Sequence, residues 1–573
     1  MLKNNKIILT LIFLLALFLR TWNLGNIPEA IDEDELAMGY YGYSLIKSGG
    51  DEYGHKLPLY FESIGDYKYG LYSYFATIPV AILGLNPFSA RLPAALAGSL
   101  TTIVLFYLVL EIFKNKKIAY LSALILAISP MHIHFSRVAY SNILGLLFAT
   151  LFTLFYLKFL KNGKNKFLIL SLVTFLASIF TYQTFRIFLP ALAILILVFA
   201  FKKLSAKVKT KAIILLVSII FLVGLSLIPK ESRARAQDIS LLYSSSKLTE
   251  DIAEDGLAKT SIFVARAFHN KIVLTGTSFI NRYLSYFDPR FLFMEASGEV
   301  ERHTIPGVGV FYLVELPFVL LSLLYFFKYK KDQFIYIPLI WILVGPLAAS
   351  LIVEPVSTTR SIPIVIGFSI LTALGIYTLL DLVKFKKVAV LIISLAFLGN
   401  FVYVTHQYLI HKLYHHPWYS DVGLKEMVEA INLRYYAKYD KIIVPRGHYM
   451  PFLFYGKIDP REFIKKATIL PRSQAQWNRI IAYDKLIFNI PYDCPAAGKE
   501  RVLYVCFGTK VPAKAEVLEV IRFRDSLPAI TLVEFKRNLP NENLPERLER
   551  SKDIPKEFPD GIIPDNYGYY WPN

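Results

Sequence analysis

The fold of this chain is constrained most by long stretches that carry no Asp, Glu, Lys or Arg. Four of them are Phe167–Phe185, Ala212–Pro229, Gln333–Val353 and Ser361–Leu380. A membrane-spanning helix needs about 20 mostly apolar residues, so each stretch is a candidate span. The 573-residue chain is 55% hydrophobic and only 19% charged, whereas soluble domains are about a quarter charged. These values exclude a disordered protein and an ordinary soluble enzyme.

Weaker apolar runs raise the predicted number of spans to eleven. The predicted spans lie near residues 7–20, 92–113, 118–135, 141–158, 167–183, 187–201, 212–229, 306–327, 334–353, 361–380 and 388–405. No small-residue cleavage site follows the first run, so we predict an uncleaved anchor rather than a signal peptide. Residues 69–85 are also apolar, but a span there would reverse the side of every later loop. We predict that this segment lies along the outer surface.

Every second connection between the predicted spans is rich in lysine. These five loops hold Lys114, Lys116 and Lys117; Lys158, Lys161, Lys164 and Lys166; Lys202, Lys203, Lys207, Lys209 and Lys211; Lys328, Lys330 and Lys331; and Lys384, Lys386 and Lys387. Positive loops stay in the cytoplasm, so the N-terminus is predicted inside and residues 406–573 outside a plasma membrane. In a soluble protein, the net charge of +19 would suggest nucleic acid. Here it is a topology signal, and we predict no nucleic-acid partner.

Arginine follows the opposite pattern, because every arginine up to residue 405 falls on the predicted outer side. These residues are Arg20, Arg91, Arg137, Arg186, Arg233, Arg235, Arg266, Arg282, Arg290, Arg302 and Arg360. A guanidinium group binds phosphate through two parallel hydrogen bonds. The pattern therefore favours an anionic ligand at the outer face. The alternative explanation for this distribution of arginine is codon bias together with contacts to lipid headgroups.

The long outer loops, residues 21–91 and 230–305, are candidates for the functional site. The first holds consecutive acids from Asp32 to Glu35, followed by Asp66 and Lys68. An acid and a lysine beside the membrane could act as a general base and a phosphate clamp. A solvated acidic surface is the alternative interpretation.

Six short motifs follow one another along the chain: Pro28–Tyr40 with its Asp-Glu pair, Gly65–Lys68, Ala90–Pro93, His134–Arg137, Thr181–Arg186 and Thr358–Pro363. They resemble motifs of the phospholipid-carrier-dependent glycosyltransferases of the GT-C class. This group includes protein O-mannosyltransferases and the aminoarabinose transferase that modifies lipid A. The order of the six motifs along the predicted topology covers most of residues 1–405.

The resemblance implies a polytopic, α-helical GT-C-like module in residues 1–405. It also implies inverting transfer of a sugar from a polyprenyl-phosphate donor to a hydroxyl of a lipid, glycan or protein. Both acids of the pair Asp34-Glu35 would be catalytic, and Asp34 would accept the proton of the acceptor hydroxyl. Lys68 would hold the donor phosphate. The arginines expected to help neutralise the leaving phosphate are Arg137, Arg186 and Arg360.

The chain departs from these relatives after the Ser-Arg pair, where they often carry an acid. Ser141 and Asn142 stand there instead. If the acid of the relatives orients the acceptor or the sugar, Asp66 is our candidate for that role in this chain. Glu315 lies within the predicted span 306–327, and such an acid is a candidate functional site or half of a structural pair with an arginine.

No metal site is predicted. His132 and His134 have no cysteine or acid near them, so hydrogen bonding is the better interpretation than zinc ligation. A divalent cation stays open as a cofactor.

Residues 406–573 have the length of one domain. Helical spacing over 423–439 and strand-like runs at 486–490, 502–507, 517–522 and 530–535 predict a small α/β domain, with a Pro- and Tyr-rich tail from about 538. The two cysteines, Cys494 and Cys506, both lie in this domain. Outside the cytosol they could form a disulfide, and free buried thiols are the alternative.

A transporter or flippase for a polyprenyl-phosphate-linked glycan is the main competing function. Such proteins place polar residues at the membrane midplane and often show internal repeats. The ionisable residues of this chain instead gather in its outer loops. The sequence therefore favours the transferase, although it identifies neither the sugar nor the acceptor.

Overall fold

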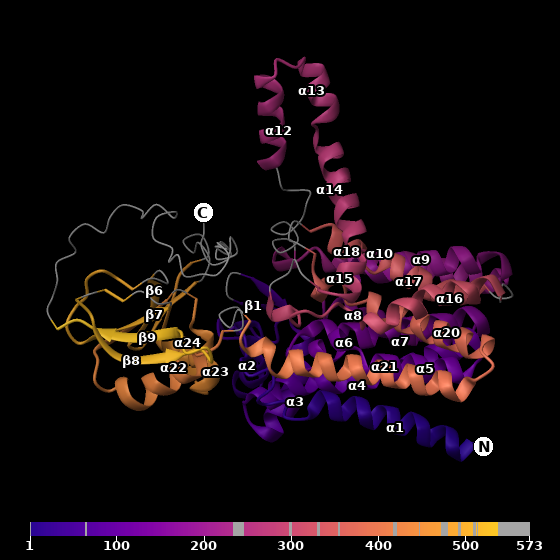
Figure 1. Cartoon of the computed structure of the whole chain (residues 1–573). Helices are drawn as coiled ribbons and strands as arrows, with labels where there is room; N and C mark the ends of the chain where they lie inside the picture. The colour runs from indigo at the N-terminus through magenta and orange to yellow at the C-terminus, as the bar shows by residue number, and fades with distance from the viewer. Residues whose placement is uncertain are drawn as a thin grey trace. The chain divides into compact units, whose positions relative to one another are not determined.

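The chain forms two compact units in the computed structural model (Figure 1). The structure describes residues 2–536 apart from 64–65, 233–245, 297–300, 329–332, 353–355, 416–420, 446, 472–478, 491–493, 508–510 and 513. The membrane unit comprises Met1–Ile46, Leu57–Phe61 and Tyr67–Ser420. The C-terminal unit comprises Lys47–Lys56, Glu62–Asp66 and Asp421–Asn573. The predicted tail from about 538 lies outside the described residues.

Helices make up most of the membrane unit. In its first half they are α1 (Leu2–Thr21), α2 (Glu33–Ser48), α3 (Leu71–Leu83), α4 (Pro87–Phe113), α5 (Lys116–Ile128), α6 (Pro130–Ser136), α7 (Ser141–Asn162), α8 (Asn165–Ile179), α9 (Phe185–Ala200) and α10 (Ala206–Ser226). The second half holds α12 (Ser246–Leu257), α13 (Ile262–Phe268), α14 (Lys271–Ser285), α15 (Pro289–Phe293), α16 (Leu316–Lys328), α17 (Ile337–Val344), α18 (Leu347–Ser350), α19 (Thr358–Ser361), α20 (Ile364–Leu382) and α21 (Lys386–Leu409). Two short strands, β1 (Tyr60–Glu62) and β2 (Tyr67–Tyr69), pair in the first outer loop.

The apolar helices confirm a multi-pass membrane protein. Among the described residues, seven are long and apolar enough to cross a bilayer: α4, α7, Phe185–Lys203, α10, Gln333–Ser350, α20 and α21. The pair α5 and α6 makes an eighth if its 59° bend lies within one span. Pro130 follows the bend and lacks the N–H that would continue the helix. Helix α1 and the shorter apolar helices Asn165–Ile179 and Leu313–Phe327 occupy the other three predicted ranges.

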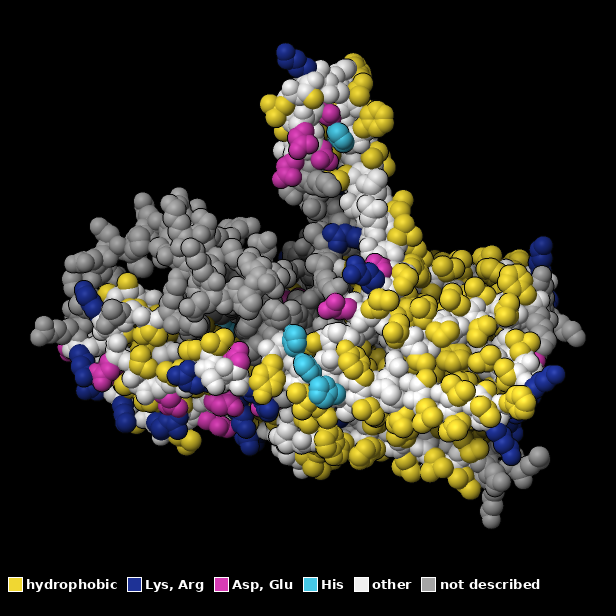
Figure 2. Space-filling model, in the orientation of Figure 1, with side chains coloured by type: hydrophobic (Ala, Val, Ile, Leu, Met, Phe, Trp, Pro, Cys, Tyr) yellow, Lys and Arg dark blue, Asp and Glu magenta, His cyan; other side chains and the backbone are white. Residues whose placement is uncertain are grey.

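The surface of the membrane unit is apolar over a broad band (Figure 2). Helix α21 contributes exposed Val388, Leu391, Ile392, Leu395 and Leu398 to it. Soluble proteins rarely expose patches of this size, whereas lipid tails cover them without cost. Lys and Arg side chains border the band at the end of the bundle that carries the N-terminus (Figures 1 and 2).

Close helix packing depends on small residues at specific positions. At Gly375 of α20, an added Cβ would lie 1.8 Å from the carbonyl oxygen of Phe318 in α16. At Gly98 of α4, it would lie 2.1 Å from the hydroxyl oxygen of Ser136. Glycine therefore lets the backbone of α16 approach α20 at Gly375 and leaves room for the Ser136 side chain at Gly98.

A seven-stranded sheet forms the core of the C-terminal unit. Its strands are β3 (Lys441–Pro445), β4 (Ala467–Ile469), β5 (Ile480–Tyr483), β6 (Leu486–Ile490), β7 (Val502–Phe507), β8 (Glu516–Arg522) and β9 (Pro528–Glu534), in the order β4-β5-β6-β3-β7-β9-β8. Strand β3 runs parallel to both of its neighbours, and the other pairs are antiparallel. With helices α22 (Leu424–Ala430), α23 (Met450–Tyr455) and α24 (Pro460–Lys466), the sheet confirms the predicted α/β architecture.

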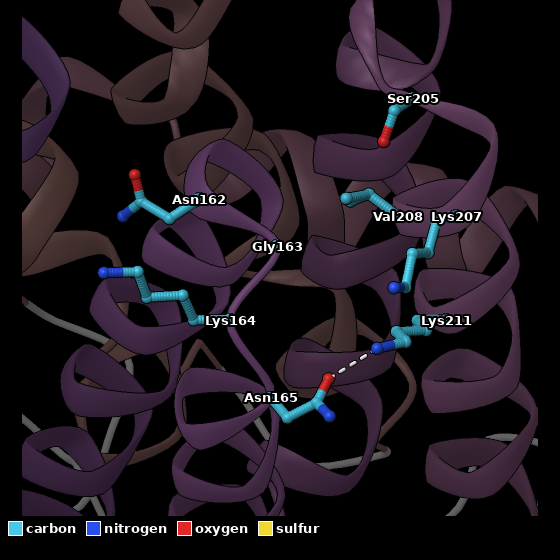
Figure 3. Close-up of a pocket in the computed structure, with 8 residues that line it drawn as sticks. All are labelled: Asn162, Gly163, Lys164, Asn165, Ser205, Lys207, Val208 and Lys211. Atoms are coloured by element: carbon cyan, nitrogen blue, oxygen red, sulfur yellow. Dashed lines mark hydrogen bonds between the residues drawn. The ribbon is translucent and has the colours of Figure 1, made fainter.

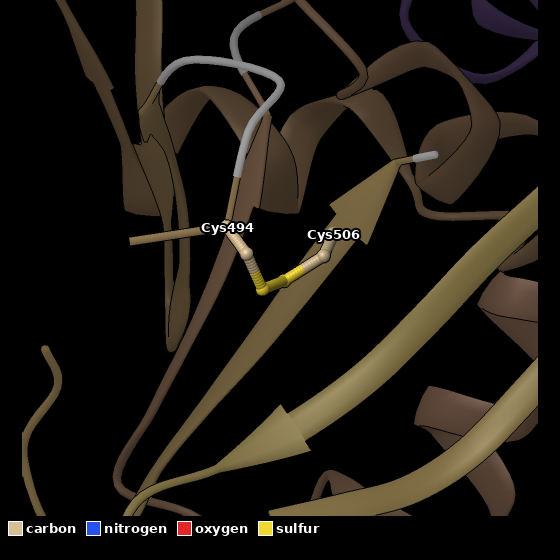
Figure 4. The surroundings of a disulfide bond; sticks show 2 residues. All are labelled: Cys494 and Cys506. Atoms are coloured by element: carbon tan, nitrogen blue, oxygen red, sulfur yellow. A yellow bond between two sulfur atoms is a disulfide. The ribbon is translucent and has the colours of Figure 1, made fainter. Parts of the chain in front are cut away.

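A disulfide joins Cys494 to Cys506 of β7 (Figure 4). Cys506 belongs to a buried cluster with Val502 and Tyr504 of the same strand and Val533 of β9. The disulfide therefore ties the segment before β7 to the centre of the sheet.

Two segments of the loop at residues 21–91 are part of the C-terminal unit rather than of the membrane unit. Glu62 forms an ion pair at 2.8 Å with Nη1 of Arg479, whose guanidinium group also lies over the ring of Tyr53. The hydroxyl of Tyr449 donates to Glu52 at 3.2 Å. These long-range contacts join Glu52, Tyr53 and Glu62 to residues of the C-terminal unit about 400 positions later.

Candidate active site

The acidic cluster at residues 32–35 forms the start of helix α2. Asp32 precedes the helix, and its Oδ1 atom accepts a hydrogen bond from the backbone N–H of Glu35 at 2.9 Å. Carboxylates are favourable at a helix N-terminus because they satisfy free N–H groups and oppose the helix dipole. This preference also favours Asp34 and Glu35 in the first turn of α2. Because they are consecutive residues of a helix, their side chains point in different directions.

Asp34 is the accessible acid of this turn. Its side chain is 44% exposed, and its Oδ1 atom accepts a hydrogen bond from Nζ of Lys68 at 2.5 Å. On its other side, Oδ2 lies 3.7 Å from Nη2 of Arg302. Two cations thus flank one solvent-accessible carboxylate, and Lys68 on β2 is itself almost buried.

Glu35 has the opposite environment. Its carboxylate is buried and receives two hydrogen bonds from Arg91, Nε to Oε2 at 2.8 Å and Nη2 to Oε1 at 2.9 Å. The backbone N–H of Ala139 donates a third, at 2.6 Å. The remaining Arg91 donors bind backbone carbonyls of the preceding loop, those of Leu24, Pro28 and Ala30. Glu35 and Arg91 therefore clamp the loop before α2 to α4.

Asp32 is held by a phenol and lies near a cation. The hydroxyl of Tyr140 donates to Oδ2 of Asp32, and Nε of Arg302 lies 4.0 Å from the same oxygen. Burial, together with the charge of Asp32, raises the pKa of Tyr140 well above its usual value. Tyr140 therefore keeps its proton and remains a donor.

A cavity of about 20 Å³ lies beside these acids. Its lining comprises Pro28, Ala30, Asp32, Glu35, His134, Val138, Arg302 and Lys412. Nζ of Lys412 donates to the carbonyl oxygens of Arg302 and Thr304 at 3.1 and 2.6 Å. Two acids and two cations from segments far apart in sequence therefore meet at one small cavity.

Arg137 and Arg186 are both nearly buried, with different partners. Nη1 of Arg137 donates to the carbonyl of Leu19, and Nη2 donates to those of Trp22 and Ile27. Its terminal nitrogens thus bind backbone at the end of α1. Arg186 instead donates to side-chain hydroxyls of Ser232 and Tyr60, at 2.5 and 2.7 Å, and its guanidinium group lies 4.7 Å from the ring centre of Tyr69.

The other predicted residues are spread over several elements. Arg360 lies in the short helix α19, where its backbone N–H donates to Ser357 Oγ at 3.4 Å. Asp66 belongs to the C-terminal unit, and its carbonyl accepts a hydrogen bond from the N–H of Ser63. Asn142, which stands where relatives carry an acid, donates to the carbonyl of Thr359 at 3.4 Å.

Glu315 has partners other than an arginine. Its Oε2 atom accepts from the hydroxyl of Thr372 in α20 at 2.8 Å, and Oε1 accepts from the backbone N–H of Tyr312 at 3.2 Å. The carboxylate therefore caps the start of its own helix and links it to α20.

The two histidines of α6 have different neighbours. His132 Nδ1 lies 2.7 Å from Nη2 of Arg20, and His134 Nε2 lies 3.1 Å from the carbonyl of Arg302. Within the described part of the chain, no group of three or more His, Cys, Asp or Glu side chains is placed to hold a metal ion.

Sequence reasoning missed Tyr140 and Lys412 and did not select Arg302 among the outer arginines. Arg302 is 268 positions from Asp34 along the chain, and no local pattern relates them. The positions of Tyr140, directly before a predicted span, and of Lys412, shortly after the last one, could have marked both as outer-face candidates.

The sequence profile of one family matches the chain, at residues 71–228. Its description is dolichyl-phosphate-mannose-protein mannosyltransferase. The matched region runs from α3 to the end of α10. This match confirms the resemblance to lipid-carrier-dependent glycosyltransferases and supports glycosyltransferase activity. No curated protein matches the chain significantly.

Two solved structures resemble the chain at low sequence identity. The Archaeoglobus fulgidus oligosaccharyltransferase, in complex with Zn and sulfate, is 12% identical with a TM-score of 0.48. The match covers 79% of this chain and 61% of that one, so this chain spans about three fifths of its length. ArnT from Cupriavidus metallidurans, bound to undecaprenyl phosphate, is 12% identical with a TM-score of 0.49, covering 91% of this chain and 97% of that one.

Proposed function

We propose that this protein is an integral-membrane glycosyltransferase that uses a polyprenyl-phosphate sugar as donor and works at the outer membrane face. The observation that carries the proposal is the accessible Asp34 carboxylate between the cations Lys68 and Arg302. The profile match of residues 71–228 supports the same reaction class. The acceptor is a hydroxyl group of a lipid, glycan or protein.

In the proposed reaction, Asp34 takes the proton of the acceptor hydroxyl. The acceptor oxygen forms a bond to the anomeric carbon while the bond from that carbon to the phosphate oxygen breaks. The attack comes from the face opposite the phosphate, so the configuration inverts. The leaving phosphate keeps the bonding electrons and gains negative charge, which nearby cations stabilise most in the transition state.

In this scheme, Lys68 and Arg302 first bind Asp34 and then bind the donor phosphate. Both contact Asp34 in the structure. We propose that the donor phosphate displaces Asp34 as their partner, which leaves the carboxylate free to act as a base. Arg186 and Arg360 are proposed as further phosphate ligands. For Arg137, whose terminal nitrogens bind backbone carbonyls, we propose a positioning role instead.

The test is transfer from defined polyprenyl-phosphate sugars by the purified full chain in detergent. Asp34→Asn should lower the rate of transfer by about 10²- to 10⁴-fold, the usual contribution of a general base. Donor binding, measured separately, should persist in this variant. Lys68→Ala should weaken donor binding as well as the rate.

Glu29→Gln provides a matched control for Asp34→Asn. Glu29 is exposed in the same outer loop, and its substitution removes the same unit of charge. Its transfer rate should stay near that of the wild type. An unreduced rate in Asp34→Asn would rule out the base assignment. A properly folded chain that transfers no sugar from any lipid donor would instead favour the transporter.

A further inference from the structure

A second polar pocket lies at the opposite, lysine-rich end of the membrane unit (Figure 3). It is an open cavity of about 520 Å³ between the α7–α8 connection and the start of α10. Its lining comprises Asn162, Gly163, Lys164, Asn165, Ser205, Lys207, Val208 and Lys211. None of these eight residues is acidic. Neither the proposed reaction nor the predicted topology requires a pocket here.

Two lysines of α10 supply most of the charge that faces the cavity. Figure 3 shows Lys207 and Lys211 extending from α10 toward the α7–α8 connection, whereas Lys164 points to its other side. Nζ of Lys211 donates to the side-chain oxygen of Asn165 at 2.6 Å, which fixes the ammonium group at the edge of the cavity. The amide group of Asn165 and the Ser205 hydroxyl add neutral hydrogen-bonding groups.

Two long helices begin at this cavity. Helix α8 has 15 residues and starts after Lys164, and α10 has 21 residues and starts after Ser205. Neither of these two N-cap side chains makes a capping hydrogen bond. The N-terminus of a helix carries partial positive charge and N–H groups without helical partners. Lysines beside two such ends repel them, and a bound anion would relieve that repulsion.

Apolar side chains are exposed farther along the same two helices, at steps of four residues from Asn165 and of three residues from Lys211. Helix α8 exposes Ile169 and Val173, and α10 exposes Ile214 and Val217. The two helices pack against each other. A ligand with a phosphate group and acyl chains can therefore contact the lysines and the apolar faces together, whereas a free phosphate can use only the lysines. Basic pockets of this kind between membrane helices suit anionic lipid headgroups.

We propose that this pocket binds the phosphate headgroup of an anionic phospholipid, whose acyl chains lie along α8 and α10. The site is distinct from the outer-face site, and it does not depend on the proposed glycosyltransferase function. It gives two of the five lysine-rich loops a binding role in addition to their role in topology.

The test is native mass spectrometry of the full chain in detergent, titrated with phosphatidylglycerol or with neutral phosphatidylcholine. The double variant Lys207→Gln/Lys211→Gln should bind phosphatidylglycerol at least tenfold more weakly than the wild type. The control is Lys202→Gln/Lys209→Gln, which removes the same charge from the same loop but from residues that do not line the cavity. It should bind nearly as tightly as the wild type. Equal losses in both double variants, or no loss in either, would overturn the proposal.

Two further measurements separate folding from binding and lipid from free phosphate. Ser205→Asp places a good N-cap at α10, so it should preserve or raise thermal stability while its charge weakens phosphatidylglycerol binding. Unchanged binding in this variant would count against the site.

Inorganic phosphate at millimolar concentration should not displace the lipid. If inorganic phosphate displaced the lipid and bound as tightly as phosphatidylglycerol, the pocket would be assigned to a soluble phosphate compound instead.

Discussion

The neighbouring acids Asp34 and Glu35 illustrate how one residue step changes the role of a side chain. Asp34 is 44% exposed between two cations, whereas Glu35 is buried on the guanidinium group of Arg91. A general base must reach a substrate proton, and only Asp34 can do so without breaking a buried ion pair. We therefore assign Glu35 a positioning role rather than the catalytic role expected from the Asp-Glu motif.

Glu35→Gln should destabilise the membrane unit by about 3–5 kcal/mol, because it leaves Arg91 buried without its charged partner. Thermal unfolding in detergent measures this loss. The control is Glu29→Gln, which removes an exposed acid of the loop before α2. A surface substitution of this kind should change stability by only about 0.5 kcal/mol or less. Similar losses in the two variants would contradict the clamp.

Packing between helices should depend on glycine at one crossing in particular. Gly375→Ala would place its new methyl group 1.8 Å from the Phe318 carbonyl, so α16 and α20 must separate. We expect a loss of about 1–3 kcal/mol in stability, as for other overpacked sites. Gly399→Ala in α21 is the control, since no atom lies within 4 Å of its added Cβ. Alanine there should be neutral or slightly stabilising, and a tolerated Gly375→Ala would show that the helices are not closely packed.

The loop segment 47–56 should make the stability of the C-terminal unit depend on pH. Burial raises the pKa of Glu52 well above its usual value of 4.5, and the charge of Asp51 acts in the same direction. The other titratable groups in this cluster are Tyr53, Glu62, Tyr449, Arg479 and His55, whose Nδ1 lies 2.8 Å from Oδ2 of Asp51. The folded unit therefore holds a proton that the unfolded chain loses above pH 4.5. This contribution is complete below pH 4.5 and is lost as the pH rises through the folded pKa.

Glu52→Gln should remove this part of the pH dependence. Urea unfolding of the C-terminal unit within the full chain, followed by proteolysis between pH 5 and 8, measures it. Glu462→Gln is the control, because that side chain is 52% exposed in an i,i+4 pair on α24. An equally steep pH dependence in Glu52→Gln and the wild type would contradict the assignment.

Elements with a strong local pattern could be predicted from the sequence. The predicted strands at 486–490 and 502–507 coincide with β6 and β7, and the predicted helix at 423–439 shortens to Leu424–Ala430 with one further turn to Tyr435. The strands β4 and β5 are three and four residues long, too short for alternation to stand out. The pairing of Glu35 with Arg91 and of Asp34 with Arg302 arises from tertiary packing, which no single-sequence pattern encodes.

The whole molecule combines a helical unit with exposed apolar side chains and a second unit built on a seven-stranded sheet. The lysine-rich loops predict that the C-terminal unit lies outside the membrane. Protease added to intact cells or right-side-out vesicles should therefore cleave the C-terminal unit and spare the lysine-rich loops. Lysed membranes, in which both sides are accessible, provide the control. Protection of the C-terminal unit until lysis would contradict the predicted topology.

The central claim is inverting sugar transfer from a polyprenyl-phosphate donor. NMR of the product formed by the purified chain from a donor of known anomeric configuration tests it most directly. The account predicts a glycosylated acceptor with the opposite configuration at the anomeric carbon and the release of one polyprenyl phosphate per sugar transferred. A product with retained configuration, or an intact donor that is moved between leaflets without any transfer, would contradict it.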